Sequence, residues 1–324
     1  MPGYKGTLRP RVLEYRVSRS QGIAFLHLHV LMKRFRQQLL VFFNHHPSLS
    51  LLSLLGPSLF WLGVFFLVPL LIIFLYSFLQ KGSYGGIIYQ FTLENYRRFL
   101  DPLYLTILVR SFKLALMTTL ICLVTGYPIA YRIAFAGKKW KNTLLVLIIL
   151  PFWTSFLIRT YAWMLLLRDT GLINQLLLKF HIVREPLKLL YTEGAVLVGM
   201  VYGFLPFMVL PLYASIEKLD KTLLEAAEDL GATPFWRFLK VTLPLTLPGV
   251  IAGSILVFIP SVAAFVTPDL LGGAKTMMMG SLIQNQFGPA RDWPFGSAIS
   301  LVLMLLVLIS LFIYLRLTKE NKGI

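Results

Sequence analysis

Residues 225–244 read E-A-A-E-D-L-G-A-T-P-F-W-R-F-L-K-V-T-L-P, and long apolar runs flank this charged stretch on both sides. Asp220 is placed to cap a first short helix, and Gly231 stands where a left-handed residue commonly ends such a helix. Thr233 followed by Pro234 is typical of an N-cap and the first position of a second helix. We therefore expect two short helices that meet at a bend between two membrane spans.

One face of the first expected helix is small and apolar. Leu223, Ala227 and Leu230 recur at helical spacing, and Ala226 lies beside them. The two alanines would allow another surface to approach this face closely. On helical pattern alone, however, a solvated linker or an interfacial amphipathic helix is the favoured interpretation.

A set of fixed positions changes that interpretation. The set consists of Glu225-Ala226-Ala227, Gly231, Val241 and Leu243-Pro244. In residue type and spacing it resembles the EAA loop of bacterial ABC importer permeases, although Val241 stands where that family usually has Ile. The resemblance implies a cytoplasmic coupling helix that docks into a groove of a separate ATPase subunit. The residues that it implies for this contact are Glu225, Ala226, Ala227 and Gly231.

The composition is that of a membrane protein. The 324 residues are 57% hydrophobic and only 14% charged, whereas soluble domains average about 25% charged residues. The net charge of +17 is spread among apolar runs, so we expect no nucleic-acid partner. The single cysteine, Cys122, excludes an intramolecular disulfide.

Six apolar runs are long enough to cross a bilayer, which takes about 20 residues of helix. They are residues 47–80, 114–131, 142–167, 194–216, 241–268 and 293–315. The predicted fold class is therefore all-α, a polytopic membrane protein with six transmembrane helices. Arg159 interrupts the third run, and we expect its charge to pair with an acid or to turn outward.

The distribution of Lys and Arg predicts the orientation. These residues concentrate on the side that holds both termini and the 225–244 stretch, so the positive-inside rule places both termini in the cytoplasm. Residues 1–50 are interpreted as a basic cytoplasmic extension. Residues 51–318 form the predicted permease domain, with the EAA loop at 217–244, and residues 319–324 form a cytoplasmic tail.

Further segments narrow the resemblance to one family of transporters. They are residues 91–96, 101–104, 150–154, 205–208, 215–220 and 291–296. These segments look like those of spermidine/putrescine ABC permeases, and within such a set the chain is similar to the first permease subunit. The resemblance implies a type I importer in a bacterial inner membrane. Its parts would be two ATPase subunits, a second permease subunit, an external polyamine-binding protein and a polyamine substrate.

A polyamine carries several positive charges, which carboxylates and aromatic faces stabilise. Phe152, Trp153 and Tyr161 in the third span supply aromatic rings for a tentative substrate path. Asp269, at the outer end of the fifth span, is the preferred carboxylate contact. Capping of the turn that follows is an equally good role for Asp269.

Other functional classes lack their motifs. Residues 269–275 look like a phosphate loop, but Ala274 precedes Lys275 where such a loop needs glycine. We therefore expect ATP hydrolysis on a separate subunit, with no cofactor and no metal in this chain. All five histidines lie outside the predicted spans, which speaks against an intramembrane enzyme. The remaining alternatives are a permease for another small solute and an ATP-independent channel, which would not need the EAA loop.

Overall fold

The computed structural model describes residues 47–83 and 85–320. The predicted basic extension therefore lies mostly outside the described residues, as does most of the predicted tail. The described chain is mainly helical and includes an antiparallel hairpin of β1 (Gln80–Lys81) and β2 (Ile87–Ile88). It divides into two compact units, one ending at Leu71 and the other beginning at Ile72.

The described part of the first unit is apolar helix. It contains α2 (Pro47–Leu62), the π-helical segment η1 (Gly63–Leu67) and the start of α3 (Val68–Ser77). Pro69 has no amide hydrogen to donate, and the backbone just before it adopts the π pattern, with the Val68 amide donating to the Gly63 carbonyl. The rings of Trp61 and Phe65 stack at 4.4 Å between centroids.

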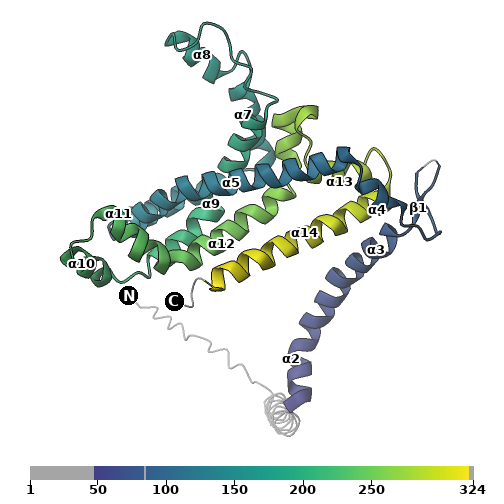
Figure 1. Cartoon of the computed structure of the whole chain (residues 1–324), viewed down its shortest axis with the longest axis horizontal. Coiled ribbons are helices and arrows are strands. Elements are labelled where there is room, and N and C mark those ends of the chain that lie inside the picture. Colours follow the sequence, from purple (N-terminus) through teal and green to yellow (C-terminus); the bar gives the residue numbers. More distant parts are fainter. Residues whose placement is uncertain (1–46, 84, 321–324) are drawn as a thin grey trace, which may run out of the picture. The chain divides into compact units, whose positions relative to one another are not determined.

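The core of the second unit is a bundle of α5 (Pro102–Ala134), α9 (Glu193–Ile216) and α12 (Leu243–Val262), shown in Figure 1. Small residues allow the helices to approach closely, as is common between membrane helices. A Cβ added to Gly249 of α12 would lie 2.5 Å from the Ser215 Cβ and 2.7 Å from the Pro211 carbonyl oxygen of α9. Glycine is therefore required there by the close contact between the two helices.

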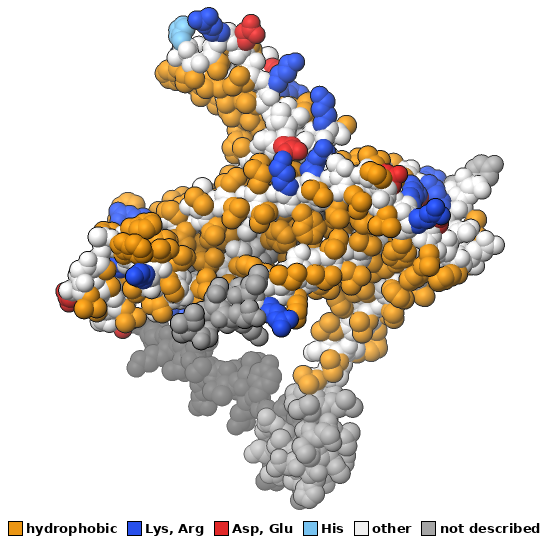
Figure 2. All heavy atoms as spheres, in the orientation of Figure 1, with side chains coloured by type: hydrophobic (Ala, Val, Ile, Leu, Met, Phe, Trp, Pro, Cys, Tyr) orange, Lys and Arg blue, Asp and Glu red, His pale blue; other side chains and the backbone are white. Residues whose placement is uncertain are grey.

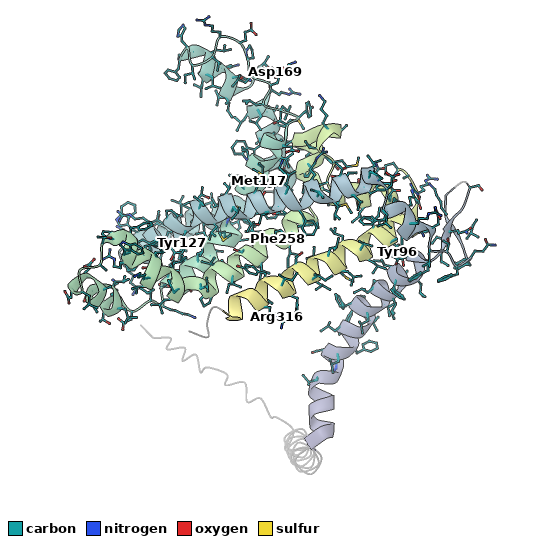
Figure 3. All side chains as sticks on the ribbon, in the orientation of Figure 1. Tyr96, Met117, Tyr127, Asp169, Phe258 and Arg316 are labelled. Carbon is teal, nitrogen blue, oxygen red and sulfur yellow. The ribbon has the colours of Figure 1, made fainter. Side chains whose placement is uncertain are left out.

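Hydrogen bonds also connect these three helices near one end of the bundle. The hydroxyls of Tyr127 (labelled in Figure 3) and Thr246 lie 2.7 Å apart, and both are buried. Thr246 donates to the Thr242 carbonyl at 2.7 Å, so Tyr127 is the donor to Thr246. Ser215 of α9 donates to the Thr246 carbonyl at 3.4 Å.

The second unit also contains the following elements. They are α4 (Glu94–Phe99), α6 (Lys138–Ile149), η2 (Leu150–Trp153), α7 (Phe156–Leu167), α8 (Leu172–Lys179), α10 (Lys221–Asp229), α11 (Pro234–Arg237), η3 (Phe238–Thr242), η4 (Pro268–Gly272), η5 (Gly273–Thr276), α13 (Met279–Phe287) and α14 (Trp293–Glu320). In Figure 1, α10 and α11 lie at one end of the bundle, whereas β1, α4 and α13 lie towards the other.

The six predicted spans agree with the structure in number. Within the described residues, five helices are long and apolar enough to cross a membrane, and a bent pair makes a sixth if it counts as one span. The helix predicted to begin at residue 114 begins earlier, at Pro102, because Asp101 caps it by accepting from the Leu103 amide at 2.8 Å.

The third and fifth spans differ from the prediction. Residues 142–167 were expected to form one helix, but the halves Lys138–Trp153 and Phe156–Lys179 meet at 91°. Thr154 between them is extended, and its hydroxyl donates to the Pro151 carbonyl at 2.7 Å, which ends the first half. The fifth helix stops at Val262, and Pro268 starts the separate segment η4.

Candidate functional site

The connection between α9 and α12, residues 217–242, is here named the α10–α11 loop. It folds as the two short helices that the sequence predicts. The Asp220 carboxylate accepts from the Thr222 amide at 3.0 Å at the start of α10. Thr233 occupies the N-cap position of α11 without a side-chain capping bond, and Pro234 is the first helical residue.

The end of α10 is a Schellman motif centred on Gly231. The Gly231 amide donates to the Glu228 carbonyl at 2.8 Å, and the Ala232 amide donates to the Ala227 carbonyl at 3.0 Å. Gly231 has a φ of +79°, as the sequence predicted. This conformation is readily available only to glycine, and it turns the chain from α10 into α11.

An ion pair and ring contacts brace the bend. The Glu228 carboxylate of α10 pairs with the Arg237 guanidinium of α11. The Lys221 ammonium lies 5.6 Å from the centroid of the Phe135 ring, which connects the start of α10 to the end of α5. The α10–α11 loop is therefore held in shape by its own residues and by the helix end beside it.

Glu217 joins the base of the loop to the first half of the broken third span. Its carboxylate lies 2.9 Å from the Lys141 ammonium of α6. A hydrogen bond from the Tyr213 hydroxyl and then the ion pair with Lys141 lower the pKa of Glu217 from its ordinary value. This ion pair therefore connects the α10–α11 loop directly to α6, so that a movement of the loop is transmitted to that helix.

Part of the surface of the α10–α11 loop is apolar and exposed. Leu230 is 89% exposed, and Leu223, Phe235 and Trp236 are also exposed, whereas Leu224 is buried at 7%. Figure 2 shows apolar side chains beside charged ones at this end of the bundle. Of the predicted contact residues, Glu225, Ala226 and Gly231 are exposed and Ala227 is half-buried. An exposed apolar patch of this kind is typical of a docking surface.

A different arrangement occurs around Asp292, which caps α14. Its carboxylate lies 2.8 Å from the Arg98 guanidinium and 3.6 Å from the Lys81 ammonium, and the side chain is 1% exposed. The other carboxylate oxygen accepts from the Phe295 amide at 3.2 Å. The Arg98 guanidinium also lies 4.0 Å from the centroid of the Phe295 ring. Lys81, Arg98 and Asp292, named the Asp292 cluster, tie β1, α4 and α14 together.

The predicted path residues lie in η2, α7 and η4, and their shared role in a substrate path stays a prediction. Phe152 contacts the ring of Phe207 on α9 at 5.0 Å between centroids. Trp153 is 83% exposed and Tyr161 is 51% exposed. Asp269 is exposed in η4, and within the described residues its carboxylate has no hydrogen bond or ion pair. The alternative role of Asp269 as a turn cap therefore has no supporting contact.

Arg159 lies in the first turns of α7, just after the break in the third span. The guanidinium carbon lies 5.0 Å from the Phe152 ring centroid and 5.6 Å from that of Phe156. Its Nε and Nη1 atoms are buried without a hydrogen-bond acceptor in the described chain. Within the described residues Arg159 forms no ion pair with an acid, and the side chain as a whole is half-buried, so its outward orientation stays a prediction.

The rings of Phe152 and Phe156 stabilise the half-buried guanidinium of Arg159. Each cation–π contact contributes roughly 0.5–2 kcal/mol. Among the described residues, no group of His, Cys, Asp or Glu could hold a metal ion.

Several of these contacts could not be read from sequence. The pairs Lys141–Glu217 and Arg98–Asp292 join residues far apart in the chain. Resemblance alone singles out residues 291–296 in the sequence, and the contacts of Asp292 explain part of that pattern. For Lys141 and Glu217, the only signal in the sequence was their position in loops on the same predicted side of the membrane.

Comparisons with known proteins place this arrangement in context. Residues 123–321 match the family described as "Binding-protein-dependent transport system inner membrane component". The chain is 46% identical to the spermidine/putrescine transport system permease protein PotB of Escherichia coli (strain K12), over 80% of this chain and 94% of that protein. It is 44% identical to PotB of Haemophilus influenzae, over 80% of this chain and 91% of that protein.

A solved structure shares the fold at low sequence identity. It is a chain of a bacterial alginate ABC transporter, crystallised in complex with an alginate pentasaccharide-bound periplasmic protein. The TM-score is 0.64 and the identity is 16%, with 86% of this chain and 97% of that chain covered. At this level of identity the likeness shows the fold alone.

Proposed function

Because the chain belongs to the family of binding-protein-dependent transport system inner membrane components, we propose that it is the translocating permease subunit of an ATP-driven polyamine importer. The predicted all-α ABC importer permease fold is confirmed by the family match and the shared fold. The observation that carries the substrate class is the 46% identity to a spermidine/putrescine permease over 94% of that protein's length.

The α10–α11 loop supports a role in coupling. In this proposal its exposed apolar face, with Glu225, Ala226, Ala227 and Gly231, docks into a groove of a separate ATPase subunit. Two ATPase subunits, a second permease subunit and an external polyamine-binding protein complete the importer. The chain itself carries no cofactor and does not hydrolyse ATP.

The orientation follows from the charges. Lys and Arg concentrate on the side of both termini and the α10–α11 loop, and the positive-inside rule assigns that side to the cytoplasm. The Asp292 cluster then lies at the outer surface of the bacterial inner membrane. In this orientation the docking surface faces the compartment that holds ATP.

Movement would pass from the ATPase to the substrate path through named contacts. Closure of the ATPase subunits displaces α10, and the Glu217–Lys141 pair transmits that displacement to α6. The chain after α6 carries Phe152 and Trp153, and Tyr161 lies in the second half of the broken span. We propose these aromatic residues and Asp269 as contacts for the cationic substrate in the outward-open state.

The test uses the purified complex of this chain with its co-encoded neighbours in lipid nanodiscs. We expect spermidine or putrescine, presented with the binding protein, to raise the ATPase rate, and matched amounts of an amino acid or a sugar to leave it unchanged. Stimulation by another solute but not by either polyamine would contradict the polyamine as the substrate. It would still agree with a permease subunit of an ATP-driven importer. Uptake that persists after loss of the α10–α11 loop would instead favour an ATP-independent channel.

A narrower test concerns Asp269. If its carboxylate contacts the substrate, Asp269→Asn weakens uptake at sub-saturating polyamine while the basal ATPase rate persists. Glu185→Gln is a matched control, because Glu185 is also exposed, lies on the same predicted side and takes no part in the proposed path. Equal uptake by Asp269→Asn and the unmodified complex would remove Asp269 from the path.

A further inference from the structure

A pocket of about 640 Å³ lies between the last turns of α5 and the segment that leads from the α10–α11 loop into α12. One wall is α5, where Val124, Pro128 and Arg132 recur every four residues and therefore share a face. The opposite wall consists of residues of α11 and η3 together with the first residue of α12, and it includes Arg237 and Leu243. The volume is in the range of pockets that hold small ligands.

The pocket is apolar at one end and basic at the other. Val124 belongs to the uncharged run 114–131, and Arg132 is the first charged residue after that run. The eight residues from Val124 to Arg132 cover about 12 Å of helix. On the opposite wall, Leu243 begins the apolar helix α12 and Arg237 lies in the α10–α11 loop. Because α5 ends where α12 begins, both walls change from apolar to basic in the same direction.

Aromatic rings line the middle of the pocket. The rings of Tyr127 and Phe238 meet edge to face at 5.2 Å between centroids, and the ring of Tyr131 lies 4.6 Å from that of Phe135. The hydroxyl of Tyr127, labelled in Figure 3, is held by its hydrogen bond with Thr246. Aromatic rings of this kind are typical of the boundary between the hydrocarbon of a bilayer and its head groups.

The basic end of the pocket carries an excess of positive charge. Arg237 pairs with the Glu228 carboxylate through its Nη1 atom. Arg132 is exposed, and within the described residues its side chain has no ion pair or hydrogen bond. The two guanidinium groups are therefore balanced by one carboxylate. Because a guanidinium presents a planar fork of donors that matches a phosphate, this end of the pocket fits a phosphate group.

Other occupants fit this order of groups less well. A polyamine is a cation like the two arginines, and residues 1–46 contain eight Lys and Arg but one Glu. A cytoplasmic ATPase subunit would not extend to Val124, which lies inside a membrane span. An α-helix of a second permease subunit is about 10 Å across, and a 12 Å length of it would fill roughly 900 Å³, which is more than the pocket provides.

We propose that this pocket binds an anionic phospholipid, with the phosphate between Arg132 and Arg237 and an acyl chain along Val124 and Leu243. Basic pockets between membrane helices on the cytoplasmic side bind such head groups in other membrane proteins. The lipid touches both α5 and α11, and so it holds the α10–α11 loop against the end of the bundle. The inference rests on the proposed function only for the orientation of the chain, and it is independent of the transported solute.

The head-group end is tested by native mass spectrometry of the full chain, purified free of its own lipids and titrated with dioleoylphosphatidylglycerol. We expect Arg132→Gln to weaken lipid binding about tenfold, because it removes a charged contact with the phosphate. Lys139→Gln is the matched control, since Lys139 is exposed on the same predicted side and does not line the pocket. Equal affinities of the two variants for the lipid would overturn the proposal.

A second pair of variants tests the acyl chain. Val124→Phe fills the apolar end of the pocket, and we expect it to weaken lipid binding several-fold. Leu116→Phe adds the same ring at another exposed position of α5 outside the pocket, and we expect it to bind the lipid as the unmodified chain does. Inorganic phosphate in excess is then added as a competitor and should leave the lipid bound. Normal lipid binding by Val124→Phe, or displacement of the lipid by inorganic phosphate, would overturn the proposal and favour a site for a free anion.

Thermal unfolding covers the case in which Arg132→Gln is less stable than the unmodified chain. A ligand that binds the folded state raises the unfolding temperature. Nanodiscs of phosphatidylglycerol, compared with nanodiscs of phosphatidylcholine, should therefore raise it for the unmodified chain and for Lys139→Gln. We expect a much smaller rise for Arg132→Gln. An equal rise for all three proteins would overturn the proposal.

The titration is repeated on the complex of this chain with its co-encoded neighbours. We expect the complex to retain one phosphatidylglycerol that Arg132→Gln releases. Absence of this lipid from the complex, when the chain by itself binds it, would overturn the proposal and assign the pocket to contact with a neighbouring subunit. None of these measurements uses a transported solute, so failure of the polyamine assignment would be seen separately in the ATPase assay.

Discussion

The Asp292 cluster and the α10–α11 loop are built on opposite principles. In the cluster, a carboxylate that is 1% exposed is satisfied by two cations and a backbone amide of the same chain. In the loop, hydrogen bonds and one ion pair set the backbone shape, but Leu230 is left 89% exposed. The charges of the cluster are paired within this chain, whereas the loop leaves an apolar surface that we expect another protein to cover. Changes in the cluster should therefore alter stability, and changes on the loop surface should alter assembly.

The largest expected change in stability comes from Asp292→Ala. It leaves Arg98 and Lys81 without their shared partner and removes the cap of α14, and we expect a loss of about 3 kcal/mol in the free energy of unfolding. Thermal unfolding in detergent measures it. Asp269→Ala is the control, because Asp269 is exposed and has no partner in the described chain. Equal unfolding temperatures for the two variants would contradict the structural role of the cluster.

Two leucines in or next to α10 sharpen the comparison within the loop itself. Leu224→Ala removes a buried side chain, and we expect about 2 kcal/mol of destabilisation. Leu230→Ala should leave the unfolding temperature unchanged and should reduce the amount of ATPase subunit that co-purifies. Unfolding scans and pull-downs on both variants test this. A stability loss at Leu230 matching that at Leu224 would show that Leu230 is not a free docking residue.

Gly231→Val tests the bend. The added Cβ meets no atom within 4 Å, so the cost comes from the positive φ and is about 1 kcal/mol. We expect the spans to remain inserted while the ATPase subunits detach and ATP-driven uptake is lost. Gly137→Val is the control, because Gly137 also has open space but an ordinary φ of −59°. A normal amount of co-purified ATPase together with normal transport would contradict the assignment of the α10–α11 loop as the contact with the ATPase.

The smallest effect concerns pH. The Tyr213 hydrogen bond and the Lys141 ion pair lower the pKa of Glu217, so its contribution to stability is present above the ordinary pKa, 4.5, and is lost as the pH falls through the lowered value. Glu217→Gln should therefore remove a small part of the stability at pH 7 and flatten the acid limb of the unfolding curve. Identical acid limbs for the variant and the unmodified chain would show that the Lys141–Glu217 contact contributes nothing.

The parts of the fold that depend on neighbouring residues were predictable. Apolar runs identified the membrane helices, because a bilayer imposes a length of about 20 apolar residues on each span. The motif and the turn residues of the α10–α11 loop identified Gly231 as a left-handed helix end, and the structure gives it a φ of +79°. The cap at Asp220 was predictable for the same reason, since its hydrogen bond joins residues two positions apart.

The pairing of charges was decided by tertiary structure. Arg98 and Asp292 are separated by 194 positions, and nothing local indicates that they meet. The 91° bend in the third span was also not predicted. An apolar run indicates how long a membrane segment is, but it does not indicate the direction of the helix axis. Arg159 shows the same limit most clearly: the sequence places a cation in an apolar helix, but only the tertiary structure shows that its guanidinium lies against the rings of Phe152 and Phe156.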